Sequence, residues 1–177
     1  MVAAPQLGHT RHGTASEPAA TPARNKDGVG WAMIDSDGPR LRVLFVCTHN
    51  SARSQMAEGF LRAMAGDRFD VKSVGTERTS VPPLAIQTMA ERGIDISGHT
   101  SKLLAGLMQE PWDYVVTVCD DANERCPLFP GRVKRLHWSF EDPSRATGSD
   151  ADRLETFRRV RDQIASQLQH WLSTEQA

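Results

Sequence analysis

The sequence predicts an α/β protein with a parallel sheet, and two observations lead to this fold class. Short apolar runs typical of buried strands alternate along the chain with segments whose apolar residues recur at helical spacing. Such alternation produces parallel strands joined by right-handed helical crossovers. Two of the apolar runs also end at a cysteine, Cys47 and Cys119. Ligands of parallel sheets bind beyond the carboxyl ends of the strands, so a functional site is expected there.

Apolar spacing and turn residues predict the elements in the first half of the domain. Most residues at 41–46 are apolar, which predicts a buried strand, while residues 69–75 alternate between polar and apolar. Apolar residues recur at helical spacing after Arg53, and Pro82 and Pro83 stop extended structure and open a second helix. The expected elements are a strand over 41–47, a helix from Arg53, a strand over 69–75 and a helix from Pro83 to Gly93.

The second half of the domain continues the same alternation. A shorter helical pattern spans 103–107, and residues 112–118 are mostly apolar and predict a strand buried on both faces. A fourth strand is expected over 133–137. From Asp150 a long helix is expected, because large apolar residues recur on one face as far as Trp171.

Length, composition and charge restrict the class of protein. The chain has 177 residues, a net charge of −1 and 39% hydrophobic residues, as expected for a globular protein with one substantial core. The charge balance gives no attraction to nucleic acid or an anionic membrane, and no apolar run is long enough to span a bilayer. Three cysteines without a secretory signal favour a reducing cytoplasm.

Residues 1–40 differ in composition from the rest of the chain. They are rich in Ala, Pro, Gly and Thr, lack periodicity and carry charges that cancel. The sequence therefore predicts a disordered N-terminal extension over 1–40, followed by a single domain over 41–174. Met33, shortly before the first strand, is a second candidate translational start.

The stretch from Cys47 to Ser54, here called the anion loop, carries the strongest chemical signal. Backbone N–H groups converge at a strand-to-helix turn, and with the helix dipole and Arg53 they can bind a doubly charged tetrahedral anion. The same field is expected to lower the pKa of Cys47, which makes its thiolate a nucleophile at neutral pH. The residues expected to bind the anion are Thr48, His49, Asn50, Ser51, Ala52, Arg53 and Ser54.

Two side chains refine this interpretation of the loop, and a structural interpretation competes with it. Asn50 tolerates a left-handed backbone, and the Ser54 hydroxyl can hydrogen-bond the thiolate and lower its pKa further. In the competing interpretation Cys47 is a small buried hydrophobe and Arg53 a solvated residue in the first turn of the helix.

Cys119 and Cys126 flank a short predicted helix that begins at Asp120. They are too far apart for a zinc-binding Cys-x2-Cys pair and lack a companion pair, so no metal site is expected. A helix separates them by about 10 Å, whereas a disulfide needs Cα atoms within about 7 Å. The pair can bridge only if the segment unwinds, and the alternative is two unrelated reduced cysteines.

A general acid is expected in the loop after the fourth strand. Asp142 precedes Pro143, which holds the loop rigid, and a carboxyl group there suits protonation of a leaving oxygen. Glu141 beside it is the competing candidate. Because the loop follows a strand, it belongs to the same rim of the sheet as Cys47 and Cys119.

With these motifs, residues 41–172 resemble the thioredoxin-coupled arsenate reductases built on the low-molecular-weight tyrosine phosphatase fold. The stretch CTHNSARSQMAEG, residues 47–59, is similar to the anion loop and helix of that family. VTVCDDANERCP is similar to its relay-cysteine segment, and HWSFEDP, residues 137–143, to its acid loop. The resemblance implies a four-stranded parallel sheet in the order 2-1-3-4, flanked by helices, with no prosthetic group.

The resemblance also implies a reaction, the reduction of arsenate to arsenite for detoxification. Cys47 is then the nucleophile, Arg53 the anion clamp and Asp142 the acid. Cys119 and Cys126 relay a disulfide. Thioredoxin, or alternatively glutaredoxin, supplies the reducing equivalents, and phosphate and sulfate are substrate analogues. A cytoplasmic monomer without nucleic-acid or membrane partners is expected.

Two other functions stay open. A phosphatase of the same fold needs only Cys47, Arg53 and Asp142, although aromatic walls for a phenol are poorly supplied. Weak aryl phosphatase activity is expected even from a reductase. A protein that binds As(III) or a soft metal through three thiols would leave Arg53 without a purpose.

Two residues depart from the family pattern. His49 replaces a common glycine and is expected to narrow the mouth of the loop. Some relatives hold a monovalent cation near Asn50, Glu58 and Ser73 with an acidic residue after His-Thr-Ser, where this chain has Lys102. The Lys102 ammonium is therefore expected in the place of that cation.

Overall fold

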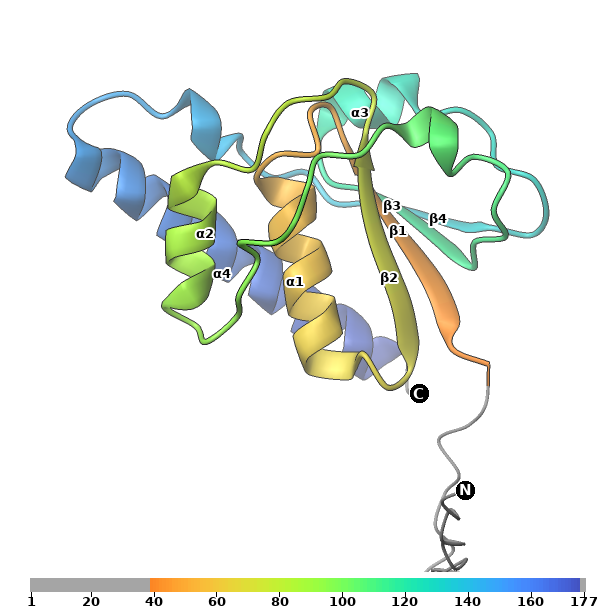
Figure 1. Cartoon of the computed structure of the whole chain (residues 1–177). Coiled ribbons are helices and arrows are strands. Elements are labelled where there is room, and N and C mark those ends of the chain that lie inside the picture. The colour runs from red at the N-terminus through yellow and green to blue at the C-terminus, as the bar shows by residue number, and fades with distance from the viewer. Residues whose placement is uncertain (1–38, 176–177) are drawn as a thin grey trace, which may run out of the picture. The chain divides into compact units, whose positions relative to one another are not determined.

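A four-stranded parallel sheet forms the centre of the fold, in the order β2-β1-β3-β4 (Figure 1). The predicted fold class and strand order are thus confirmed. The strands are β1 Leu41–Cys47, β2 Phe69–Gly75, β3 Tyr114–Thr117 and β4 Lys134–His137. Because all four strands run in one direction, their carboxyl ends share one edge of the sheet, and the predicted site residues follow there.

The computed structural model describes residues 39–175, which fall within one compact unit, residues 35–177. The predicted disordered extension over 1–40 lies outside the described residues, except for Pro39 and Arg40. Its boundary and its disorder therefore stay predictions.

Helices connect the strands as the apolar spacing predicts. The elements are α1 Arg53–Ala65, α2 Pro83–Ala90, α3 Asp120–Arg125 and α4 Asp150–Thr174, with short 3-10 turns η1 Leu104–Gly106 and η2 Pro143–Arg145. In Figure 1, α1, α2 and α4 gather on one side of the sheet, and α3 lies near the carboxyl ends of the strands. The short helix therefore belongs to the edge where the site is expected.

The core lies between the sheet and these helices. Residues 43–46 of β1 are fully buried, as expected for a central strand covered on both faces. On α4, Phe157 and Leu168 are buried at the predicted helical spacing. Trp171 of α4 packs its ring 5.9 Å from that of Trp138, the residue after β4. This contact fixes the start of the acid loop to the core.

α2 ends at Ala90 instead of Gly93 and β4 begins at Lys134 instead of Val133, and two larger differences from the sequence prediction concern β3 and the segment at 103–107. β3 is shorter than predicted because Trp112 lies outside it, with its indole N–H donating to Leu107 O at 2.9 Å. The helical pattern at 103–107 forms only a 3-10 turn, because Leu103 pairs with Gly75 as an isolated bridge at the edge of the sheet. Neither difference moves a predicted site residue.

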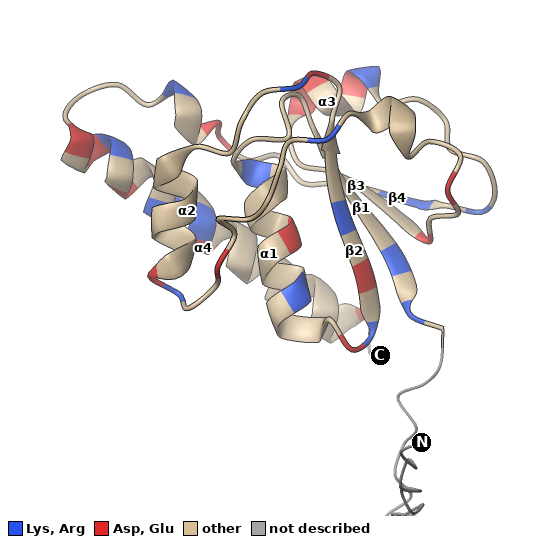
Figure 2. Cartoon of the chain, viewed as in Figure 1, with Lys and Arg blue, Asp and Glu red and all other residues tan. Residues whose placement is uncertain are grey.

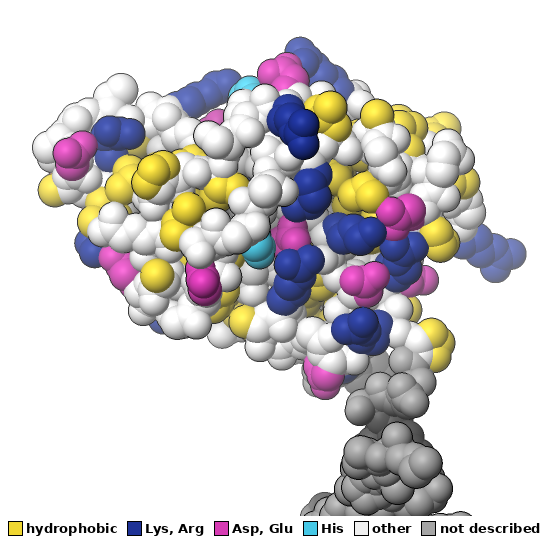
Figure 3. Space-filling model, in the orientation of Figure 1, with side chains coloured by type: hydrophobic (Ala, Val, Ile, Leu, Met, Phe, Trp, Pro, Cys, Tyr) yellow, Lys and Arg dark blue, Asp and Glu magenta, His cyan; other side chains and the backbone are white. Residues whose placement is uncertain are grey.

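Charged side chains of both signs are interspersed over the helices and strands (Figure 2), in keeping with the net charge of −1. On the face shown in Figure 3, hydrophobic side chains form small areas between charged ones. Within residues 39–175, no helix combines the length and the hydropathy needed to cross a bilayer.

Candidate active site

The anion loop connects β1 to α1 and is held by the side chain of Asn50. Asn50 adopts a left-handed backbone with φ of 46°, as its residue type allows. Its amide donates to Ser54 Oγ at 3.0 Å and to Ser73 Oγ at 2.8 Å, and its oxygen accepts from Lys102 N at 2.7 Å. These bonds tie the loop to α1, to β2 and to the segment after α2.

Gly75, the last residue of β2, gives the loop room to pass over the strand. A Cβ at this position would stand 2.6 Å from Asn50 N and 2.7 Å from Thr48 O, too close for any side chain. Glu77 N donates to the same Thr48 oxygen at 2.8 Å. The loop therefore rests directly on the backbone at the edge of the sheet.

Arg53 begins α1 and contacts the acid loop. The helix has no side-chain cap and no acidic residue in its first turn, so its first N–H groups and its dipole are available to an anion. The guanidinium donates to Phe140 O at 3.1 Å and to Asp142 Oδ2 at 3.0 Å. Its Nε is buried and, among residues 39–175, is one of two buried side-chain polar atoms without a hydrogen-bond partner. A further anion can bind this donor.

Cys47 lies at the base of the loop with its thiol 2% exposed. Its Sγ is 2.9 Å from Ser54 Oγ and accepts from Asn50 N at 3.0 Å. Burial raises the pKa of Cys47 above its ordinary value, although Ser54, Arg53 and the backbone N–H lower it. The prediction of a lowered pKa is therefore wrong here, because the removal of the thiol from water outweighs the lowering by Ser54 and Arg53.

The remaining loop residues differ in burial, and their contact with an anion stays a prediction. Thr48 and Ala52 are buried, whereas Ser51 is partly exposed. His49 turns to the side: its Nε2 is 3.3 Å from Glu77 Oε2. The imidazole therefore contacts the segment after β2, and a narrowing of the mouth by His49 stays a prediction.

Asp142 and Glu141 differ in position. The side chain of Asp142 is 14% exposed, faces Arg53 and accepts from Ser144 N at 3.0 Å. Glu141 is 58% exposed and pairs with Arg159 of α4 at 2.6 Å. The geometry therefore favours Asp142 as the carboxyl group of the site.

Cys119 reaches the same site from the end of β3. Its Sγ is 3.5 Å from Thr48 Oγ1, and its side chain is buried. Cys126, at the other end of α3, is half-buried, and burial raises the pKa of its thiol. All three cysteines of the chain are free, and α3 separates Cys119 from Cys126 as the sequence predicts.

A cavity of about 450 Å³ opens beside the anion loop, and Cys47 is not among the residues that line it. Arg53, Cys119 and Asp142, which come from three distant segments of the chain, line it together. Asp120 and Asp121 of α3 also line it, so carboxylates surround the guanidinium. Two arginines, Arg53 and Arg145, provide the positive charge of the cavity, and Arg53 is the one that begins α1 beside the anion loop.

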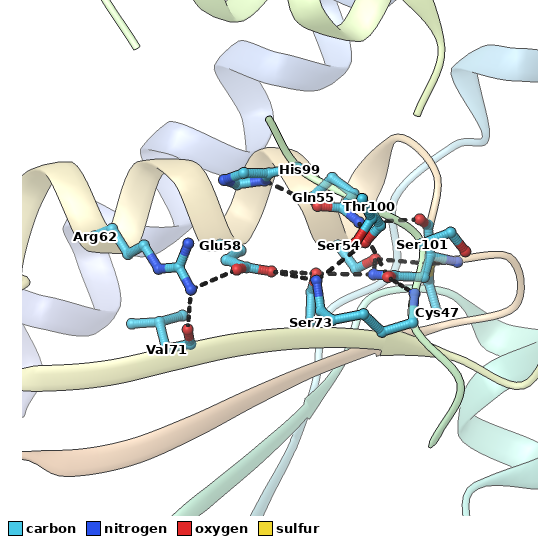
Figure 4. A network of polar contacts seen from close by, with 12 residues as sticks. Cys47, Ser54, Gln55, Glu58, Arg62, Val71, Ser73, His99, Thr100 and Ser101 are labelled. Atoms are coloured by element: carbon cyan, nitrogen blue, oxygen red, sulfur yellow. Dashed lines mark hydrogen bonds and ion pairs between the residues drawn. The ribbon is translucent and has the colours of Figure 1, made fainter. Parts of the chain in front are cut away.

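The sequence did not predict a buried chain of hydrogen bonds behind the loop. The Gln55 amide donates to Asn50 O at 3.2 Å and to Thr100 O at 3.0 Å, and its oxygen is 2.9 Å from His99 Nδ1 (Figure 4). Burial lowers the pKa of His99. A polar residue inside a helical pattern normally indicates an exposed position, so no signal in the sequence distinguishes Gln55.

Glu58 continues this polar region along α1 and is 2% exposed. It accepts a hydrogen bond from Ser73 and pairs with Arg62 at 2.7 Å and with Lys102 at 3.6 Å. The Lys102 ammonium therefore lies beside Glu58, where the sequence predicts it. Within the part of the chain that the structure describes, no cluster of His, Cys, Asp or Glu is arranged to hold a metal ion.

Comparison with known proteins gives consistent matches. Residues 42–177 match the family described as low molecular weight phosphotyrosine protein phosphatase. The arsenate reductase of Bacillus subtilis is 44% identical over 132 residues, which cover 75% of this chain and 95% of that protein. A solved structure of an arsenate reductase in the phosphate binding state is 35% identical, with a TM-score of 0.61, and covers 76% of this chain and 98% of its own.

A thioredoxin-dependent arsenate reductase from Corynebacterium glutamicum is also similar. It is 31% identical, with a TM-score of 0.57, and the match covers 77% of this chain and 65% of the chain from Corynebacterium glutamicum. The family match spans most of the chain, and the sheet order agrees with the fold that the motifs predict. The chain belongs to the low molecular weight phosphotyrosine protein phosphatase family.

Proposed function

We propose that this protein is an arsenate reductase that uses three cysteines in turn and receives electrons from thioredoxin. The observation that carries the proposal is the position of Cys119, whose Sγ lies 3.5 Å from Thr48 in the loop that also holds Cys47. A phosphatase has no use for a second thiol at its nucleophile, whereas a reductase needs one. Relatives named arsenate reductase, one of them thioredoxin-dependent, support the same activity.

Arsenate is a tetrahedral oxyanion and suits the anion loop. The first N–H groups of α1 and the unpartnered Nε of Arg53 provide donors for it. When the anion binds, the guanidinium moves from Asp142 to the substrate, which frees the carboxyl group. Phosphate and sulfate have the same shape and a similar charge, so they compete for the loop.

The first chemical step makes a bond between sulfur and arsenic. Cys47 Sγ attacks As(V), and a hydroxyl group of arsenate leaves as water. Asp142, once released by Arg53, takes the proton that the Cys47 thiol gives up and delivers it to the leaving oxygen. The oxidation states of sulfur and arsenic do not change in this step.

The second step is the reduction. Cys119 Sγ attacks Cys47 Sγ, which forms a disulfide and breaks the bond from sulfur to arsenic. The electron pair of that bond stays on arsenic, which leaves as As(III). Cys126 then attacks Cys119 Sγ, and Cys47 departs as a thiolate. Two electrons from the thioredoxin dithiol, or alternatively a glutaredoxin, reduce the Cys119–Cys126 disulfide.

The half-buried position of Cys126 explains why a third thiol is needed. Cys47 and Cys119 are 2% and 3% exposed, so a partner protein cannot reach a disulfide between them. Transfer to Cys126 moves the disulfide toward the surface.

Aryl phosphatase activity is the second candidate, because the family match and the set of Cys47, Arg53 and Asp142 support it. A phosphocysteine forms on Cys47 and water resolves it. Phe140 is the one aromatic residue among those that line the cavity, so a phenol ring finds few partners. We therefore expect this activity to be weak.

We further propose that the protein acts as a monomer in the cytoplasm. On the face shown in Figure 3, the hydrophobic areas are small and separated, so this face offers no large apolar patch for a second copy. Three free cysteines suit a reducing compartment.

A coupled assay tests the proposed function. Arsenate is supplied with thioredoxin, thioredoxin reductase and NADPH, and arsenite release and NADPH consumption are followed together. Glutaredoxin with glutathione replaces thioredoxin in a parallel series, and aryl phosphate replaces arsenate in a third. We expect catalytic arsenite release with thioredoxin. Efficient aryl-phosphate hydrolysis without arsenite release would instead support the phosphatase.

A further inference from the structure

α3 is attached to the sheet by side-chain contacts around His137, the last residue of β4. His137 Nε2 is 2.9 Å from Asp120 Oδ1, and its Nδ1 is 2.9 Å from Thr117 Oγ1 on β3. Thr117 Oγ1 donates to Asn123 Oδ1 at 3.2 Å. We call Thr117, Asp120, Asn123 and His137 the His137 network. It joins two residues of α3 to the ends of two strands.

The network holds the end of the helix that carries the second thiol. Asp120 follows Cys119 directly, and Cys119 Sγ lies 3.5 Å from Thr48 in the anion loop. Hydrogen bonds from Ser139 and His137 hold the pKa of Asp120 below its ordinary value. The carboxylate is therefore charged at neutral pH, which strengthens its bond to the imidazole.

A disulfide between Cys119 and Cys126 requires this arrangement to break. The six residues of α3 lie between the two cysteines, which places their Cα atoms about 10 Å apart where a disulfide allows about 7 Å. Asp120 and Asn123 belong to the segment that must unwind. The His137 network therefore stabilises the dithiol form of the pair and not the disulfide form.

We propose that His137 is a positioning residue that, through Asp120 and Thr117, holds Cys119 at the site and raises the reduction potential of the Cys119–Cys126 pair. The inference rests on the relay in the proposed function. Reduction adds two electrons and two protons to the disulfide and returns two thiols, and the network re-forms with them. Its contacts therefore favour reduction of the pair by an external dithiol.

The reduction potential is measured in full-length Cys47→Ser protein, in which only Cys119 and Cys126 can pair. Each variant is equilibrated with mixtures of reduced and oxidised dithiothreitol, and the dithiol fraction is measured by alkylation and mass spectrometry. Asp120→Ala is expected to increase the equilibrium constant for disulfide formation about threefold, or about 14 mV, because the pair is exposed. His137→Ala loses both contacts of the imidazole. It is expected to increase the equilibrium constant for disulfide formation about tenfold, which corresponds to about 30 mV.

Asp121→Ala is the matched control. Asp121 lies in the same first turn of α3, carries the same charge and lines the same cavity, but it is not part of the His137 network. We expect its substitution to leave the potential unchanged. His137→Gln keeps a donor that can reach Asp120 and is expected to recover part of the shift. Equal shifts for Asp120→Ala and Asp121→Ala would assign the effect to the helix dipole and overturn the inference.

Arsenite release, measured for the same substitutions with Cys47 restored, separates this inference from the proposed function. Shifted potentials in a protein that reduces no arsenate would refute the proposed function and leave the inference standing. Unchanged potentials in an active enzyme would refute the inference alone. If no Cys119–Cys126 disulfide forms in any redox mixture, both the relay and the inference are wrong.

Discussion

Arg53 and Asp142 form an ion pair at 3.0 Å. In the proposed chemistry, however, Arg53 binds arsenate and Asp142 protonates its leaving oxygen. The side chains are 10% and 14% exposed, so little water competes with the pair. An entering oxyanion replaces one negative partner of the guanidinium with another. In the proposed function, binding of the substrate and release of the acid would therefore be one event, which would couple the state of Asp142 to the presence of arsenate.

Cys47→Ser is expected to abolish both arsenate reduction and aryl-phosphate hydrolysis. A serine hydroxyl is a far weaker nucleophile than a thiol at neutral pH, so neither a sulfur–arsenic nor a sulfur–phosphorus bond can form. Both activities are measured on the same preparation, with circular dichroism as a check of folding. A variant that kept either activity at a normal rate would remove Cys47 from its role.

The raised pKa of Cys47 predicts how stability depends on pH. A folded state that binds a thiol proton more tightly than the unfolded state gains stability below the ordinary pKa of cysteine and loses it as pH rises through the folded value. We expect the free energy of unfolding to fall above pH 9 more steeply in the native protein than in Cys47→Ser. Urea unfolding between pH 7 and 10 measures this under reducing conditions, and parallel curves would contradict it.

At the scale of elements, α3 separates two thiols that the relay must join. Cys126→Ser is expected to reduce arsenate once and then stop, because Cys47 and Cys119 form a disulfide that thioredoxin cannot reach. A rapid-quench measurement of arsenite, with mass spectrometry of the non-reduced protein, detects the single turnover and the trapped disulfide. Multiple turnovers with thioredoxin would exclude the relay through Cys126.

Cys119→Ser is expected to stop at an earlier step than Cys126→Ser. It is expected to stall before arsenite leaves, because no thiol is in place to attack the sulfur of the arsenic adduct. Aryl-phosphate hydrolysis is expected to continue in both variants, since water resolves a phosphocysteine. Loss of hydrolysis in either one would indicate damage to the anion loop rather than to the relay.

The elements around the site could be predicted because burial imposes apolar spacing on them. β1 and α1 begin and end close to where the pattern places them, and Cys47 and Arg53 follow from their position at the junction. The contact between Arg53 and Asp142 joins residues 89 positions apart and has no local signal. The same holds for Gln55 and His99, whose hydrogen bond crosses 44 positions.

The pKa of Cys47 could not be predicted from the sequence for a related reason. The sequence shows which charges are near the thiol along the chain, but burial depends on the whole fold.

The start of α4, in contrast, does have a local signal in the sequence. Ser149 and Asp152 form a capping box there, a pattern of hydrogen bonds that the sequence analysis could have used.

At the scale of the whole molecule, residues 1–32 are expected to be dispensable. The family match begins at residue 42, and the alignment with the Bacillus subtilis protein covers 95% of that protein but only 75% of this chain. Deletion of residues 1–32 should leave the melting temperature and arsenate reduction nearly unchanged, because their composition predicts disorder and a disordered segment would contribute little burial. Differential scanning fluorimetry checks this, and a loss of several degrees would mean that the extension docks on the domain.

The burial of Cys47 also affects how long the protein survives between turnovers. Peroxide converts exposed thiolates to sulfenic and then irreversibly to sulfinic acid, whereas a buried, protonated thiol reacts slowly. Cys47 is buried, and burial raises its pKa, so it meets both conditions for slow reaction. The burial that fixes the nucleophile at the base of the loop therefore also limits its permanent oxidative damage.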